Sequence, residues 1–205
     1  MTITLALLII TCIISITAFN NRKVINDLIF SPVDVQQRHQ WYRFITCGLI
    51  HADFAHLAFN MITLYFFGRV MEQEYVEYFN LPKYTYLILY IVALIVSEIP
   101  SYIKHRNNNE YRSLGASGAV AAIVFVFILI APWATIYVFF IPVPAILYGV
   151  LFLVYSAYMS KKGKDNINHS AHLWGAVVGI VFTIIVQPAV VNIFIEKLLR
   201  PSFNF

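Results

Sequence analysis

Residues 115–118, Gly-Ala-Ser-Gly, open a long apolar run that continues to Ala131. Glycine has no Cβ, so the backbone can bend sharply there and another chain can approach closely. Ser117 is expected in the first turn of a helix, where unpaired N–H groups and the positive end of the helix dipole favour a developing negative charge. Those are the requirements of a serine nucleophile. A plain helix cap packed through small residues accounts equally well for the tetrapeptide alone, so the rest of the chain must supply a base.

Candidate partners for the serine lie at the start of two other apolar segments. His51, His56 and Asn60 open one of them, and His172 opens the last. His56 and Asn60 are four residues apart and share a helix face. We predict that neutral His172 is the base that takes the Ser117 proton, while the serine N–H, His56 and Asn60 donate to the oxyanion. No acidic third member is apparent, so a catalytic dyad is expected.

The composition indicates the class of protein that must position these residues. Of the 205 residues, 60% are hydrophobic and only 12% are charged, and the mean hydropathy is +0.73. These values are typical of an all-α polytopic membrane protein, because backbone that lacks water must pair within helices. The net charge of +4 comes with no basic cluster interleaved with aromatics, which argues against a nucleic-acid partner. Cys12 and Cys47 predict no disulfide, and no cofactor is expected.

Apolar runs long enough to cross a bilayer predict a bundle of six transmembrane helices. They are expected at residues 1–19, 51–72, 84–103, 114–131, 144–160 and 170–187. The polar segment 20–50 is expected to lie in the membrane interface, and residues 133–141 to form a connector. We interpret residues 1–190 as one domain and residues 191–205 as a short tail that cannot span again.

Chain parity puts the candidate residues on one side of the membrane, because the second, fourth and sixth helices all start there. The last helix also carries Gly175 and Gly179 on the same stripe as His172. Gly118 and Ala122 repeat this four-residue spacing directly after Ser117. Small residues on such stripes let membrane helices approach closely. A contact between these two helices is therefore predicted to bring His172 toward Ser117.

The motifs together resemble those of the rhomboid intramembrane serine proteases over nearly the whole chain, from about residue 1 to 190. They are His51-x-x-x-x-His56-x-x-x-Asn60, then Gly68 with Glu72, then Gly115-Ala116-Ser117-Gly118, and finally Ala171-His172-x-x-Gly175-x-x-x-Gly179. The resemblance implies a Ser117–His172 dyad, an oxyanion hole that includes His56 and Asn60, and a structural role for His51. It also implies that the substrates are transmembrane protein helices within the lipid bilayer, and we expect the cell membrane as the location.

One departure concerns the Trp-Arg pair that the family carries in its first loop. It appears here as Trp41-Tyr42-Arg43, with a tyrosine between the two. The loop charges also depart from the family orientation, because the segments on the proposed catalytic side hold more Lys and Arg than those on the other side.

Other ionisable residues in the apolar segments have structural interpretations. Glu72 is expected to tie the second helix to its neighbours near the opposite surface. Glu98, in the third helix, is expected to be a structural hydrogen-bonding group on the site side. His169 could be a second base or a histidine of the preceding loop, and the loop interpretation is favoured.

Three other functions fit parts of the pattern. A non-catalytic rhomboid-like binder or escort of membrane helices would need neither Ser117 nor His172. A zinc site could use His51, His56, His169 and His172, but it leaves the glycine-framed serine unexplained, and we predict no metal. A transporter is disfavoured because the chain shows no repeat and no paired broken helices.

Overall fold

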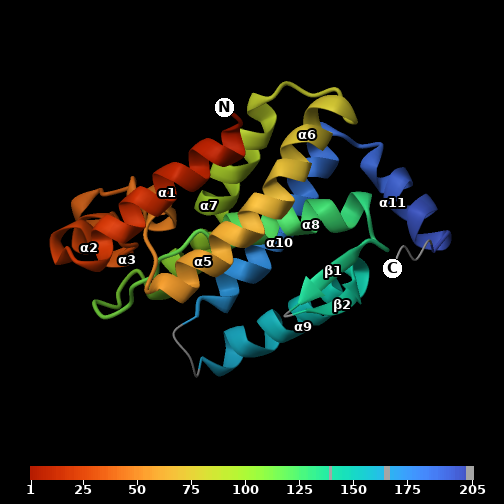
Figure 1. Cartoon of the computed structure of the whole chain (residues 1–205). Helices are drawn as coiled ribbons and strands as arrows, with labels where there is room; N and C mark the ends of the chain where they lie inside the picture. Colours follow the sequence, from red (N-terminus) through yellow and green to blue (C-terminus); the bar gives the residue numbers. More distant parts are fainter. Residues whose placement is uncertain (139, 164–166, 202–205) are drawn as a thin grey trace.

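The computed structural model describes residues 1–138, 140–163 and 167–201. Figure 1 shows a helical protein, with α1 along one side and α9 with a short hairpin on the other. The elements, in chain order, are α1 Ile3–Phe19, α2 Arg22–Leu28, α3 Pro32–Arg38, α4 Arg43–Thr46, the 3-10 turn η1 Cys47–Leu49, α5 Phe54–Thr63, the π-helical turn η2 Leu64–Gly68, α6 Arg69–Glu77, α7 Tyr84–His105, α8 Ser117–Ile130, β1 Thr135–Val138, β2 Ile141–Pro144, α9 Ala145–Lys162, α10 His169–Val186 and α11 Val190–Leu199.

Helices occupy the predicted positions, but two starting points differ. The second helical segment begins at Phe54 instead of His51, because the Asp53 side chain caps it by accepting the His56 backbone N–H at 2.7 Å. The fourth begins at Ser117 instead of Leu114, because Gly115 has φ +113° and cannot continue a helix. His51 and Gly115 therefore lie in the turns that lead into helices.

The central helix is α8. Every residue in it except Ser117 and Phe127 is buried, as expected for a helix that is apolar all round. Helices α7 and α10 pack against it, and α11 lies across its far end, where Lys197 Nζ donates to the Ile130 carbonyl at 2.6 Å. Because almost all of α8 is buried, its first turn is held in place inside the protein.

Where a simple connector was predicted, β1 and β2 pair as antiparallel strands, so the chain is not wholly helical; residue 139 lies outside the described part. Val138 pairs with Ile141, and Thr135 pairs with Pro144. The β-branched and aromatic residues of β1 favour a strand, and prolines are tolerated on an edge strand such as β2. The predicted tail also contains a helix, α11. Residues 202–205 of the tail lie outside the described part.

Two helices are long and apolar enough to cross a membrane, namely α7 and α10. The bent pair Arg43–Leu49 and Phe54–Glu77, with 98° between its halves, could be a third crossing. Helices α1 and α8 are apolar but shorter. These findings cover the described residues and agree with an integral membrane protein, whereas six crossings stay a prediction.

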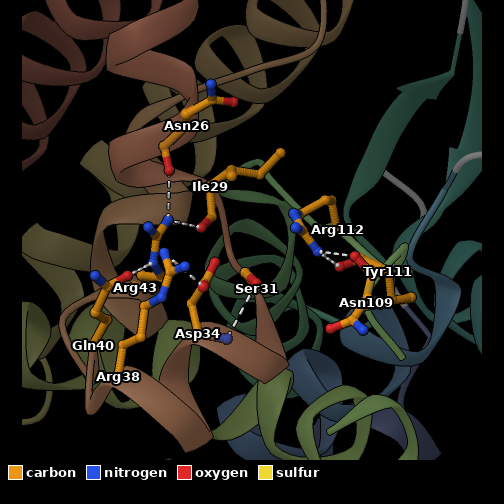
Figure 2. Close-up of polar contacts among 10 residues, drawn as sticks. All are labelled: Asn26, Ile29, Ser31, Asp34, Arg38, Gln40, Arg43, Asn109, Tyr111 and Arg112. Atoms are coloured by element: carbon orange, nitrogen blue, oxygen red, sulfur yellow. Dashed lines mark hydrogen bonds and ion pairs between the residues drawn. The ribbon is translucent and has the colours of Figure 1, made fainter. Parts of the chain in front are cut away.

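The polar segment before residue 50 is folded onto α7 through buried Phe30, Val35, Phe44 and Cys47. Arg43 is buried and organises it: its Nη1 donates to the carbonyls of Asn26 and Ile29 at 2.8 and 2.6 Å, and its Nε donates to Gln40 Oε1 at 2.7 Å (Figure 2). Trp41 is 54% exposed. Of the Trp-Arg pair, Arg43 is therefore the residue that holds this segment together.

Glu72 ties α6 to the start of α1, as predicted. Its two carboxylate oxygens accept the backbone N–H groups of Ile3 and Thr4 at 2.7 and 2.8 Å, and Lys83 Nζ lies 3.5 Å from Oε1. The first N–H groups of a helix have no partner within it, and they favour negative charge. This buried carboxylate therefore caps α1 from another helix.

Glu72→Gln is expected to lower the free energy of unfolding in detergent by about 1.5–3 kcal/mol, the range for hydrogen bonds to charged groups. The amide keeps one acceptor oxygen but offers N–H where Thr4 needs an acceptor. Thermal unfolding measures the change. Glu77→Gln is the matched control because Glu77 is exposed and accepts from the exposed side chain of Gln73. Equal stability of the two variants would contradict the capping role.

Candidate active site

The loop that leads into Ser117 is tied to two distant parts of the chain. Ser113 forms a two-bond backbone pair with Phe30, with N···O distances of 2.9 and 3.1 Å. The Gly115 N–H donates to the Cys47 carbonyl at 2.9 Å. Because both ties lie within four residues of Ser117, the starting point of α8 is set by the folded first segment as well as by the helix itself.

His51 braces the same loop, in the structural role that the family resemblance implies. It is 2% exposed; its Nδ1 lies 2.9 Å from Ser15 Oγ, and its Nε2 accepts the Ala116 N–H at 3.4 Å. Ser15 Oγ in turn donates to the Leu49 carbonyl at 2.8 Å. Since Nε2 accepts, the proton of neutral His51 sits on Nδ1 and is donated to Ser15. This single tautomer of His51 satisfies the hydrogen bonds that run from Ala116 through Ser15 to Leu49.

His56 lies directly against the glycine before the serine. A Cβ on Gly115 would come 2.8 Å from His56 Cε1 and 2.9 Å from Nε2, and the φ of +113° at this position favours glycine in any case. Asn60, one turn further along α5, is buried and donates Nδ2 to the His56 carbonyl at 3.0 Å. The amide carries a second N–H, so this bond does not exhaust its capacity to donate.

Helices α8 and α10 touch backbone to backbone, as the small-residue stripes predicted. A Cβ on Gly175 would collide with the Gly118 carbonyl group and lie 2.9 Å from its Cα. A Cβ on Gly179 would collide in the same way with Ala122, 2.8 Å from its Cα. Such contacts require glycine on α10 at both positions.

The helix contact brings the two predicted catalytic residues to adjoining turns. Ser117 immediately precedes Gly118, and His172 lies one turn before Gly175. Both side chains are partly exposed rather than buried. The dyad itself, and its depth in the membrane, stay predictions.

Aromatic rings from α9 and α10 pack against His172. Phe152 of α9 stacks on it at a centroid distance of 5.8 Å, and His169 meets it edge-on at 5.7 Å. His169 is the first residue of α10 and is 4% exposed, packed against Tyr155 of α9. The interpretation of His169 as a loop histidine is therefore wrong. It belongs to the helix and links it to α9.

This arrangement can support nucleophilic chemistry at the start of α8. In the described part of the chain Ala116, not Ser117, is the N-cap residue, and it makes no side-chain capping bond. The serine hydroxyl is thus not used as a cap, and the N–H groups of the first turn remain a source of donors for an anion. Among the described residues, no group of three or more His, Cys, Asp or Glu side chains is placed to hold a metal ion.

Sequence reasoning missed one polar residue of this region, Asn168. Its Oδ1 accepts the Ala171 N–H at 3.1 Å and caps α10, and its Nδ2 lies 3.1 Å from each carboxylate oxygen of Glu98. An asparagine just before an apolar run is a helix-start signal that could have identified the cap. The predicted structural role of Glu98 is confirmed by these bonds.

Known proteins resemble this chain, in which a serine and histidines lie at neighbouring helix starts. The Rhomboid domain family model matches residues 38–189, and the chain belongs to the rhomboid family. It is 34% identical over 173 residues to RHOMBOID-like protein 12, mitochondrial, of Arabidopsis thaliana, covering 80% of this chain and 51% of that protein. It is 27% identical to Rhomboid-like protein 11, chloroplastic, of the same plant over 69% of this chain and 51% of that one.

A third relative is named for an activity. Rhomboid protease GluP of Bacillus subtilis is 33% identical over 81 residues, which are 40% of this chain and 14% of the relative. The chain spans about half the length of the two plant relatives. Their names refer to mitochondria and chloroplasts, so the comparisons support an integral membrane protein but not the cell membrane in particular.

Proposed function

We propose that the protein is an intramembrane serine endopeptidase that cleaves transmembrane helices of membrane-protein substrates through a Ser117–His172 dyad. The observation that carries the proposal is the backbone contact of Gly118 with Gly175, which holds the start of α8 against the start of α10. Membership of the rhomboid family and a relative named as a protease support it.

The chemistry proceeds in two halves. His172 takes the hydroxyl proton as Ser117 Oγ attacks the peptide carbonyl carbon, and a tetrahedral oxyanion forms. The Ser117 N–H, His56 and Asn60 donate to that oxygen, each worth about 2.7–4 kcal/mol by the effect of removing such a donor. The C–N bond then breaks as His172 returns the proton to the leaving amine. Water, activated by the same histidine, hydrolyses the acyl-enzyme and releases the new carboxylate.

The proposal includes the architecture that the chemistry needs. Residues 1–190 would form one domain of six crossings, with residues 191–205 as a tail, in the cell membrane. The helices α1 and α8 are too short to be counted as crossings by length, but α8 is buried within the protein and needs little contact with lipid. Accessibility mapping of introduced cysteines on the two sides of the membrane tests the crossing count.

The alternative is a non-catalytic binder or escort of membrane helices. Such a binder would not need the dyad, so it would still capture a membrane helix after Ser117 and His172 are both replaced by alanine. The test is reconstitution of the wild-type protein in liposomes with a generic single-span substrate, read by appearance of cleaved fragments and by labelling with a fluorophosphonate probe. A wild-type protein that neither cleaves nor reacts would overturn the protease proposal.

His172→Ala is expected to reduce kcat by about 10³-fold or more, because the serine loses the base that activates it. Fluorophosphonate labelling of Ser117 should be lost in parallel, since it needs the same activated hydroxyl. His105→Ala is the matched control, because His105 ends α7 and stacks on Tyr111, and this variant should retain labelling. Labelling retained by the His172 variant would remove this histidine from the mechanism.

A further inference from the structure

A buried carboxylate joins the two segments that lead into Ser117 and His172. Glu98, in the middle of α7, is 5% exposed. Ser113, from the loop before α8, donates its hydroxyl to Glu98 Oε1 at 2.8 Å. Asn168, the N-cap residue of α10, donates Nδ2 to the carboxylate from the other side, 3.1 Å from each oxygen. Ser101, one turn further on α7, closes the cluster beside Asn168.

The direction of these bonds is determined by the groups themselves. The Glu98 oxygens accept from Asn168, which presents its amide N–H₂ to them. Its carbonyl Oδ1 is then left to accept the Ala171 N–H of α10, as the structure shows at 3.1 Å. Glu98 therefore orients the asparagine, and the asparagine caps the helix.

Each partner of the carboxylate precedes one member of the proposed dyad by the same number of residues. Ser113 lies four residues before Ser117, and Asn168 lies four residues before His172. Neither Glu98 nor its partners need touch a substrate. We propose that Glu98 is a positioning residue that sets the start of α8 relative to the start of α10, and so the spacing of the nucleophile and the base. This inference rests on the proposed protease function.

The proposal predicts how variants that exchange donors and acceptors between Glu98 and Asn168 should behave. In Glu98→Gln, one of the two oxygens that accept from Asn168 becomes an N–H₂ group, so a donor opposes the Asn168 amide in a buried place and only one acceptor oxygen remains. In Asn168→Asp, two carboxylates oppose each other. The double variant Glu98→Gln with Asn168→Asp reverses the bond: the introduced amide donates, the introduced carboxylate accepts, and the second oxygen of that carboxylate still caps Ala171.

The test compares these variants by kcat, KM and fluorophosphonate labelling rate, in liposomes with a single-span substrate and below the melting temperature of each variant. Displacement of a reacting group by about 1 Å can cost about 10²-fold in rate. We expect each single variant to lower kcat and the labelling rate by about 10–10²-fold with KM changed much less. The double variant should recover to within about threefold of wild type, since its bond pattern is complete again.

Thr183→Val is the matched control for loss of a buried hydrogen bond in α10. Thr183 Oγ1 lies 2.7 Å from Tyr75 Oη, near the opposite end of that helix from His172. This variant should lower the melting temperature while leaving kcat near wild type. If it lowers kcat as much as Glu98→Gln does, the Glu98 effect is general destabilisation and the proposal fails.

Two further results would overturn the positioning role while the wild-type enzyme stays active: an unchanged kcat in Glu98→Gln, or a double variant no faster than the slower single one. Should Glu98→Gln fail to insert, Ser113→Ala removes only one hydroxyl from the carboxylate, and an unchanged labelling rate in it counts against the proposal. An inactive wild-type protein would instead refute the protease function. In that case, failure of the double variant to regain thermal stability would refute the bonding pattern separately.

Discussion

Ser117→Ala is expected to abolish cleavage of a transmembrane substrate, with a loss of about 10³-fold or more in kcat. The substitution removes the atom that would form the acyl-enzyme, and the remaining oxyanion donors cannot supply another nucleophile. The fold should be unaffected, because Ala116 is the N-cap residue of α8 and the serine hydroxyl is not used for capping. Alanine is also a better helix former than serine. Loss of activity with unchanged thermal unfolding would therefore report chemistry.

The control for this result is a serine that has the same side chain but lies away from the helix contact. Ser160, near the end of α9, donates its hydroxyl to the Ala157 carbonyl at 2.9 Å. Ser160→Ala should change stability by no more than about 0.5 kcal/mol and leave cleavage intact. Cleavage that persists in Ser117→Ala, or that falls equally in both variants, would contradict a serine nucleophile at position 117.

The approach of α8 to α10 was predictable because it depends on short-range spacing. Gly175 and Gly179 stand four residues apart on one helix, and Gly118 and Ala122 stand four apart on another. A helix turns such pairs onto one face whatever the rest of the chain does. Small residues in an apolar helix have few uses other than close packing, and the structure confirms the contact.

The ties that hold the loop before Ser117 could not be predicted in the same way. The Gly115 N–H meets the Cys47 carbonyl, and Asn168 meets Glu98 across 70 residues of chain. Each is a single polar pair whose partners share no spacing pattern, so only the folded chain brings them together. The helix boundary at Ser117 likewise depends on a backbone angle at Gly115 that residue type permits but does not specify.

Gly175→Ala is expected to lower both stability and activity, although Gly→Ala within a helix ordinarily stabilises by about 0.5–1 kcal/mol. The added Cβ would collide with the Gly118 carbonyl and stand 2.9 Å from its Cα. Backbone atoms cannot rotate aside, so α8 and α10 must separate at the level of the dyad. Overpacking of this kind costs about 1–3 kcal/mol, and the accompanying displacement of His172 should slow cleavage by about 10–10²-fold.

Gly149→Ala separates the effect of helix contact from that of glycine replacement. Its Cβ would come 2.9 Å from Ile128 Cδ1, the far end of a flexible side chain that can turn aside. This variant, on α9, should therefore keep wild-type activity and lose little or no stability by thermal unfolding. If the Gly175 variant were as stable and as active as the Gly149 variant, backbone contact between α8 and α10 could not be what sets the distance from nucleophile to base. The proposed dyad would then need another means of alignment.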